Sequence, residues 1–372
     1  MLLKDKAKFA VLLAAPLVAG TISLGYAQGV DTARANIQAH RALPTFDPPG
    51  QVFDAKGCMA GKKMFIIPLS NSNPFNKAIG DAMAEAAEQV GFELRNWPVS
   101  AFDPSQWMAG IDVAIAEGYD LIDMQGGLPP ELIQAKVEEA NAKGIITTTT
   151  HNYDVTQTPA AFLDHSTRTN YGAAGRLIAD WAIAATRGNV NALIMGPDEV
   201  TPTGPLKQSI FDRLNQLGSG NKFIYVNTPF AEWQTKISVA TETAVVNDPT
   251  INWILPIYDS MSVFARQGLN AVGRDDIGIA SYNGTPGSLD LLRAGGMQMN
   301  VGESLGWVGW AGVDSNMRLL CDKGKVNDIN TPFLIFDDNN VDTSVGPDGR
   351  AEYNTGYGNA HIPGFRSLWQ LN

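Results

Sequence analysis

The sequence predicts an α/β protein with two doubly wound lobes, each a parallel sheet flanked by helices. From Lys63 onward, short apolar runs alternate with helical stretches of about 12 to 16 residues, which is typical of parallel βαβ units. The alternation gives about ten strands, which suits two sheets of five or six strands better than one open sheet. The length of 372 residues also fits two domains better than one.

The first half of the chain carries four predicted strands separated by helices. The strands are expected at 64–69, 92–97, 120–124 and 145–150, and the helices at 75–90, 105–117 and 130–143. Asn73-Pro74 and Asp103-Pro104 each place an N-cap residue before a proline at the first helical position. Gly91, Gly118 and Gly144 end the helices.

The second half repeats this pattern. Strands are expected at 191–195, 222–227, 252–256, 277–281, 297–301 and 333–336. Helices are expected at 170–187, 204–217, 232–247, 260–272, 286–295 and 307–321. Ligands of such sheets bind beyond the carboxyl ends of the strands, so two lobes with these ends facing each other enclose a cleft.

The N-terminus has the layout of a secretory signal peptide over residues 1–27. Three lysines precede an apolar stretch, 9–24, and small residues at 25 and 27 mark a cleavage site before Gln28. A membrane anchor is the alternative, but about 16 apolar residues broken by Pro16 span a bilayer poorly. We therefore expect export to the periplasm. Residues 28–60 are polar and are interpreted as an extension on the surface.

The composition excludes several classes of function. The net charge of −11 becomes about −13 without the signal peptide, which argues against nucleic acid as a partner. The four histidines have no metal-ligand spacing, and the turn 70–74 lacks the glycines of a dinucleotide site, so no metal or cofactor is expected. Cys58 and Cys321 are either one disulfide or two separate thiols.

One motif favours an enzyme. Gly302-Glu303-Ser304-Leu305-Gly306 matches the nucleophile elbow of hydrolases, and Asp337 or Asp338 and then His361 follow in the order that hydrolases use. The chain after Ser304 is too short for the remaining sheet of such an enzyme, and no glycine-rich oxyanion segment precedes it. We therefore interpret the protein as a binding protein and not an enzyme.

Amides, hydroxyls and aromatic side chains follow the predicted strands. Amide groups offer a donor and an acceptor together, as each sugar hydroxyl requires, and aromatic rings can lie against the apolar face of a sugar. Each residue alone is more often a cap or turn residue, but their joint occurrence favours a solute site. The candidates are Asn73, Phe75, Asn76, Gln125, Thr150, His151, Lys207, Trp233, Tyr258, Asn283 and Glu303.

Three segments carry a resemblance to a known family. Residues 73–75 (Asn-Pro-Phe), 256–259 (Pro-Ile-Tyr-Asp) and 282–286 (Tyr-Asn-Gly-Thr-Pro) resemble the type I, ribose-binding-like periplasmic sugar-binding proteins of ABC transporters. The resemblance implies two Rossmann-like lobes that close on a solute, and three crossing strands near 163–165, 301–303 and 336. Lobe 1 would comprise 61–164 and 303–336, and lobe 2 would comprise 165–302 and 337–372. It also implies a monomer that docks on a membrane permease.

Several candidate positions depart from the family pattern. Asn76 stands where a second aromatic residue is usual, Gln125 replaces an asparagine, and Thr150-His151 replaces an Asp-Arg pair. Lys207, Trp233, Tyr258, Asn283 and Glu303 stand for Arg, Phe, Asn, Asp and Gln respectively. Compared with the family pattern, the expected pocket carries less charge and has bulkier side chains on the second lobe. This favours a short polyol, a deoxysugar or another small polar solute. Delivery to a membrane receptor instead of a permease stays an alternative. A disulfide would staple the extension to lobe 1.

Overall fold

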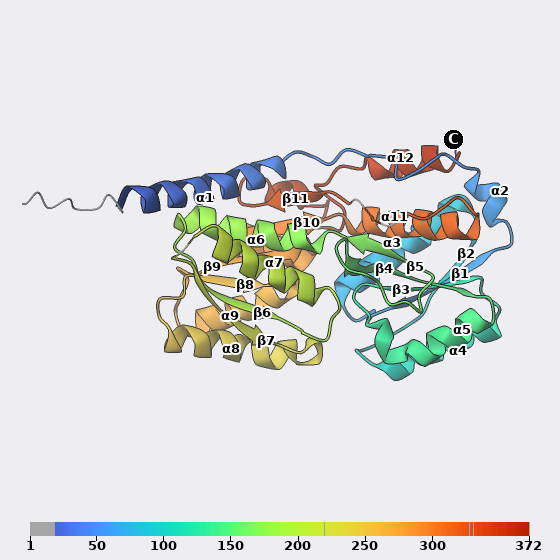
Figure 1. The fold of residues 1–372 in the computed structure, drawn as a ribbon, viewed down its shortest axis with the longest axis horizontal. Helices are drawn as coiled ribbons and strands as arrows, with labels where there is room; N and C mark the ends of the chain where they lie inside the picture. Colours follow the sequence, from blue (N-terminus) through green and yellow to red (C-terminus); the bar gives the residue numbers. More distant parts are fainter. Residues whose placement is uncertain (1–18, 219, 327, 330, 372) are drawn as a thin grey trace, which may run out of the picture.

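Two lobes lie side by side in the computed structural model, each built on its own sheet (Figure 1). The structure describes residues 19–218, 220–326, 328–329 and 331–371. Most of the predicted signal peptide, residues 1–18, lies outside the described residues. Among the helices that are described, none is both long and apolar enough to cross a membrane.

The first sheet has five parallel strands in the order β2-β1-β3-β4-β5. They are β1 (Lys63–Pro68), β2 (Glu93–Asn96), β3 (Leu121–Gln125), β4 (Ile146–Asp154) and β5 (His165–Thr169). Residues of β1 alternate between the faces: Met64 and Ile66 pack with α3 (Pro74–Val90) and α11 (Leu305–Leu320). Phe65 and Ile67 pack on the opposite face, which α4 (Pro104–Ala116), η1 (Pro130–Ile133) and α5 (Gln134–Ala142) cover.

The second sheet follows the same order and adds one antiparallel strand, giving β11-β10-β9-β8-β6-β7. Its strands are β6 (Asn191–Gly196), β7 (Lys222–Asn227), β8 (Trp253–Pro256), β9 (Gly278–Asn283), β10 (Met299–Glu303) and β11 (Phe333–Phe336). One face carries α6 (Tyr171–Thr186) and α7 (Thr203–Gln216) (Figure 1). The other carries α8 (Trp233–Asn247), α9 (Ser262–Ala271) and α10 (Pro286–Arg293), with the short turns η2 (Phe230–Glu232), η3 (Asp259–Met261) and η4 (Val341–Ser344).

The predicted helix signals are confirmed where they were most specific. Asn73 Oδ1 accepts a hydrogen bond from the Phe75 amide at the start of α3, and Asp103 does the same for Ser105 at the start of α4. Gly91 ends α3 at φ 92°, a left-handed conformation that a side chain would strain.

The lobe boundaries lie elsewhere than predicted. His165–Thr169 is the polar strand β5 of the first sheet, so the chain crosses to the second lobe after Thr169 and not before His165. β11 pairs with β10 in the second sheet, although 303–336 was assigned to lobe 1. The tail was assigned to lobe 2, but its helix α12 (His361–Leu368) packs in the core of the first lobe with α11.

The segment 28–60, named here the N-terminal strap, is not a purely superficial extension. It contains the end of α1 (Ala19–Ala39) and the short α2 (Ala55–Met59). Val30, Ala33 and Ile37 are buried in the core that includes α6, and Asn36 Nδ2 donates to Asp180 of α6 at 2.6 Å. The prediction was wrong because these few buried residues sit in a polar stretch, where a single apolar helix face is easily overlooked.

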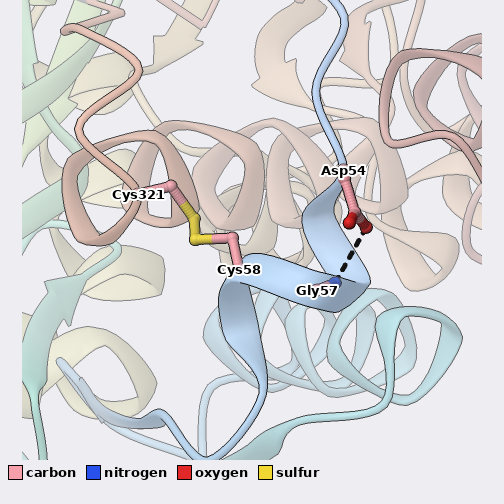
Figure 2. Close-up of a disulfide and its surroundings, with 4 residues drawn as sticks. All are labelled: Asp54, Gly57, Cys58 and Cys321. Carbon is pink, nitrogen blue, oxygen red and sulfur yellow. Dashed lines mark hydrogen bonds between the residues drawn. A yellow bond between two sulfur atoms is a disulfide. The ribbon is translucent and has the colours of Figure 1, made fainter.

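The strap runs across both lobes (Figure 1). Its His40 carbonyl accepts from the Ile335 amide of β11 in the second lobe at 2.8 Å, and the Phe53 amide donates to the Leu368 carbonyl on the first lobe at 3.0 Å. Cys58 of α2 and Cys321 at the end of α11 form a disulfide with a Cα–Cα distance of 5.9 Å (Figure 2). The strap is therefore attached to each lobe separately.

Candidate solute-binding cleft

The candidate site lies where the two sheets present the carboxyl ends of their strands to each other. In each sheet the strand order reverses once, between β1 and β3 and between β6 and β8. At such a reversal the chain leaves the two neighbouring strands toward opposite faces and opens a crevice. The loops after these four strands supply Asn73, Gly126, Val200 and Tyr258 to one small inner cavity.

Side chains from both lobes line this inner cavity. It leaves about 30 Å³ in which the centre of a water molecule fits. The first lobe contributes Leu69, Asn73, Phe75, Asn76, Gly126 and His151. The second lobe contributes Tyr171, Val200, Pro202, Phe230, Trp233, Tyr258, Ser260 and Asn283.

A larger outer cavity adjoins the inner one. The centre of a water molecule fits within about 590 Å³ of this outer cavity. The two share Asn73, Phe230, Trp233 and Ser260 in their linings. Hydroxyls and aromatic rings dominate the outer lining, which includes Ser72, Phe102 and Tyr353. Among the described residues, neither lining includes a Lys, Arg, Asp or Glu.

The first turn of α3 shapes the wall from the first lobe. Asn76 donates from Nδ2 to the Gly126 carbonyl at 2.9 Å, and its own carbonyl accepts from Gln125 Nε2 at 2.9 Å. These bonds lock the start of α3 onto the end of β3. Gly126 has φ 75°, and a Cβ there would lie 1.9 Å from Asn76 Nδ2, so a glycine is required for this contact.

Aromatic rings form the wall from the second lobe. Trp233 opens α8, and its Nε1 donates to the Thr228 carbonyl at 3.1 Å. The Phe230 ring lies 4.8 Å from the Trp233 ring, and the Tyr258 ring lies 6.3 Å from it. The Tyr258 hydroxyl is 3.1 Å from Thr203 Oγ1. All three rings therefore line the cavity, while Trp233 Nε1 and the Tyr258 hydroxyl bond within the second lobe.

Asn283, the last residue of β9, is the amide with free hydrogen-bonding capacity in this wall. Its Oδ1 is buried and has no partner within the described chain. Its backbone has φ 144°, a region that non-glycine residues rarely adopt and that holds strain. An unpaired buried acceptor costs free energy, so a ligand that donates to Asn283 Oδ1 would relieve that cost.

His151 closes the floor of the inner cavity and is held by a polar network. Its Nε2 lies 2.9 Å from Glu303 Oε2, and its Nδ1 lies 2.7 Å from the Tyr171 hydroxyl. Tyr282 also donates to Glu303 Oε2. Burial, together with the nearby Glu303 charge, raises the pKa of both phenols well above the ordinary value, which keeps them protonated as donors.

Seven of the eleven predicted site residues line the inner cavity: Asn73, Phe75, Asn76, His151, Trp233, Tyr258 and Asn283. Glu303 lies behind His151. Gln125 bonds to the α3 backbone, and Thr150 Oγ1 donates to Asp123 at 2.7 Å. Lys207 is outside both linings, because its Nζ pairs with Asp198 at 2.6 Å and lies over the Tyr225 ring.

Sequence reasoning missed seven lining residues, of which Tyr171 and Phe230 are the largest. Tyr171 follows β5, the strand that the apolar pattern did not reveal. Phe230 lies between the predicted strand 222–227 and the predicted helix at 232, so its position after a strand could have identified it. Leu69, Gly126, Val200, Pro202 and Ser260 complete the set.

The residues of the hydrolase motif are dispersed into structural roles. Ser304 is the N-cap of α11, and its Oγ accepts from the Trp307 amide at 3.3 Å and lies 3.4 Å from Asn354 Oδ1. Asp337 pairs with Arg41 of the strap. The His361 ring stacks on Trp307 at 5.3 Å. Within the described part of the chain, His, Cys, Asp and Glu side chains do not gather into a group that could hold a metal ion.

Two lobes, each a mostly parallel sheet flanked by helices, line one cavity between them. The family model of the periplasmic binding protein domain matches residues 64–325, and the chain belongs to this family. A search of curated protein sequences finds no match.

Solved structures of solute-binding proteins share the fold. One from Agrobacterium vitis, bound with α-D-tagatopyranose, has a TM-score of 0.68 at 16% identity over 78% of this chain and 100% of its own. A second structure from that organism, with bound allitol, has a TM-score of 0.67 at 18% identity, and the match covers 76% of this chain and 97% of the other. The Caulobacter myo-inositol binding protein has a TM-score of 0.66 at 15% identity, and the match covers 76% of this chain and 95% of the other.

Proposed function

We propose that the protein is a periplasmic solute-binding protein that captures a small uncharged hydroxylated solute, of the sugar and polyol class, for an ABC importer. The observation that carries the proposal is the inner cavity, which takes residues from both lobes and holds an unpaired amide oxygen, Asn283 Oδ1. A solute bound there contacts both lobes only when they are closed, so its binding energy favours the closed form.

The remaining parts of the proposal have separate support. The structures with the same fold include binders of a ketose, a hexitol and a cyclitol, and all three ligands are uncharged. The predicted signal peptide supports export. The buried residues Val30, Ala33 and Ile37 of α1 follow Ala27, so cleavage at the predicted site would keep them in the mature chain. The permease is the partner that the family implies.

A thermal-shift screen of sugars and polyols tests the proposal. A solute that binds only the folded protein raises the melting temperature, and calorimetry on each hit then gives a dissociation constant. We expect at least one hit among uncharged hydroxylated solutes, and loss of that hit in Asn283→Ala. A screen in which only charged amino acids or metal ions raise the melting temperature contradicts the proposal. Uptake of the labelled hit by cells with and without the gene tests the transport role.

A further inference from the structure

We infer that the inner cavity selects a short uncharged diol of about two to four carbons with an apolar end, and not a solute with a hydroxyl on every carbon. The inference rests on the proposed function, because it narrows the solute of the same site. It is carried by the volume of the cavity, by the apolar character of its lining and by the small number of polar atoms that are free to bind a ligand.

The volume limits the size of the solute. The centre of a water molecule fits within about 30 Å³ of the inner cavity, so for a compact shape the water itself sweeps out roughly 150 Å³ when its radius of about 1.4 Å is added. A cavity of about 150 Å³ holds a molecule of about six non-hydrogen atoms, such as benzene. A six-carbon polyol with a hydroxyl on every carbon has about twice as many non-hydrogen atoms. The larger outer cavity adjoins the inner one, and Phe230 and Trp233 line both.

The lining favours a solute with an apolar part. Rings of Phe75, Phe230 and Trp233 face the cavity together with alkyl groups of Leu69 and Val200. Burial of an alkyl end against these groups is favourable, since it removes apolar surface from water. A hydroxyl placed against the same groups would lose its hydrogen bonds to water without replacement.

Most polar atoms of the lining are already bonded within the protein. Both ring nitrogens of His151, the Asn76 amide nitrogen and Trp233 Nε1 have partners. The Tyr171 and Tyr258 hydroxyls bond to His151 and Thr203 respectively.

The polar groups left over are few. Within the described residues, the Asn283 side chain makes no hydrogen bond and Ser260 Oγ has no partner; Asn73 uses only its Oδ1. A hydroxyl both donates and accepts, so these groups satisfy about two hydroxyls. A solute with five or six hydroxyls would leave most of them unpaired in the inner cavity.

The charge of the surroundings excludes ions. Among the predicted site residues, Glu303 and Lys207 are bonded within the protein, to His151 and Asp198 respectively. Glu199 lies outside both linings, and its Oε1 accepts from the Phe230 amide at 2.6 Å. An ion in the cavity would therefore touch no side chain of opposite charge, which is costly in a buried site. Aromatic rings attract quaternary ammonium groups, so choline is the cation that tests this point.

Titration calorimetry on the mature chain tests the inference with named probes: propane-1,2-diol and butane-2,3-diol against allitol, D-tagatose, myo-inositol and choline. We expect at least one diol to bind tenfold or more tightly than every other probe. A ligand this small reaches at best about micromolar affinity, which fixes the concentrations to use. Tighter or comparable binding of a six-carbon solute overturns the inference and leaves the proposed function standing. Preferential binding of choline, or heat from none of the probes, overturns both.

A cavity-enlarging variant gives a second readout. Phe230→Ala should join the two cavities, so we expect the ratio of six-carbon polyol affinity to diol affinity to rise at least tenfold. Phe223→Ala is the matched control: this ring stacks on Phe211 at 4.7 Å in the same lobe and lies outside both linings. Melting curves establish that both variants fold. An unchanged ratio in Phe230→Ala overturns the assignment of this ring as the limit on solute size.

Discussion

His151 Nε2 and Glu303 Oε2 lie 2.9 Å apart and join the two lobes beneath the inner cavity. His151 belongs to β4 of the first sheet, and Glu303 ends β10 of the second. Both are almost fully buried, at 2% and 0% exposure. His151 also has φ 60°, a strained conformation for a residue with a side chain, and the register of β4 against β5 shifts just after Thr150. The bond therefore fixes the cavity floor at the junction of the lobes.

Removal of Glu303 should destabilise the protein strongly. Glu303→Ala removes the acceptor that His151 Nε2 and the Tyr282 hydroxyl share in a buried site and leaves these two groups, 3.2 Å apart, with only each other, so we expect a loss of about 3 kcal/mol in the free energy of unfolding. Glu303→Gln keeps one acceptor oxygen, so the loss in the free energy of unfolding should be smaller. Urea denaturation of both single variants, of His151→Ala and of the double variant measures the coupling. Losses that add within roughly 0.5 kcal/mol would show that the two residues act independently.

Loss of the amide at Asn283 should weaken solute binding. Asn283→Ala leaves a solute hydroxyl unpaired, which costs about 1–3 kcal/mol, or roughly ten- to a hundredfold in the dissociation constant. Trp233→Ala removes a large apolar contact and should cost at least as much. Lys207→Ala is the control, because its ammonium binds Asp198 outside the cavity. Dissociation constants for Asn283→Ala and Trp233→Ala that both stay within about twofold of the wild type would place the solute elsewhere.

The disulfide should stabilise the protein against unfolding. Cys58 and Cys321 are 263 positions apart, so the bridge closes a long loop in the unfolded chain, and removal of such a bridge typically costs about 2–5 kcal/mol. We expect dithiothreitol to lower the melting temperature of the wild type. The double variant Cys58→Ser/Cys321→Ser should melt at the reduced value with or without reductant. Equal melting of oxidised and reduced wild type contradicts this expectation.

The fold should lose stability in acid through His361. Burial against Trp307 and Trp310 lowers the pKa of its imidazole to about 4, against about 6.5 in the unfolded chain. The unfolded state therefore binds the proton first as the pH falls, and the contribution present above about pH 6.5 is lost toward pH 4, by about 3 kcal/mol. His361→Gln should flatten the dependence of the unfolding free energy on pH in this window. Burial also lowers the pKa of His165, which acts in the same direction, and raises the pKa of Asp259 to about 6, which acts in the opposite direction, so the measured quantity is the difference in slope between the wild type and the variant. An unchanged slope would contradict the assignment.

The sequence was most informative where local chemistry decides the structure. The caps at Asn73 and Asp103 and the apolar strands of both sheets are visible in short windows, because a cap or an alternating strand depends on neighbours in the chain. The strand β5 was missed because its sequence, His-Ser-Thr-Arg-Thr, carries no apolar pattern: its residues pair with β4 and with polar groups of the opposite segments, such as Ser315.

The site was predictable only as far as the strand ends. The position of Asn283 at the end of β9 identifies it, but whether a side chain turns into the cavity depends on partners far away in sequence. Lys207 turns to Asp198, and Thr150 turns to Asp123, and neither partner follows from the strand pattern. The role of Glu303 behind His151 likewise depends on how the two lobes meet, which a single strand does not encode.

The N-terminal strap sets the order in which the protein can be completed. Its docking sites on β11, α11 and α12 belong to the last part of the chain, while the strap itself belongs to the first. During synthesis and export the strap therefore emerges early: its α1 part can pack on α6 once the middle of the chain is present, but the rest has no surface to bind until nearly the whole polypeptide is present. The two sheets can form before it, whereas the joining of the two ends of the chain, and the oxidation of Cys58 with Cys321, belong to the final step of assembly.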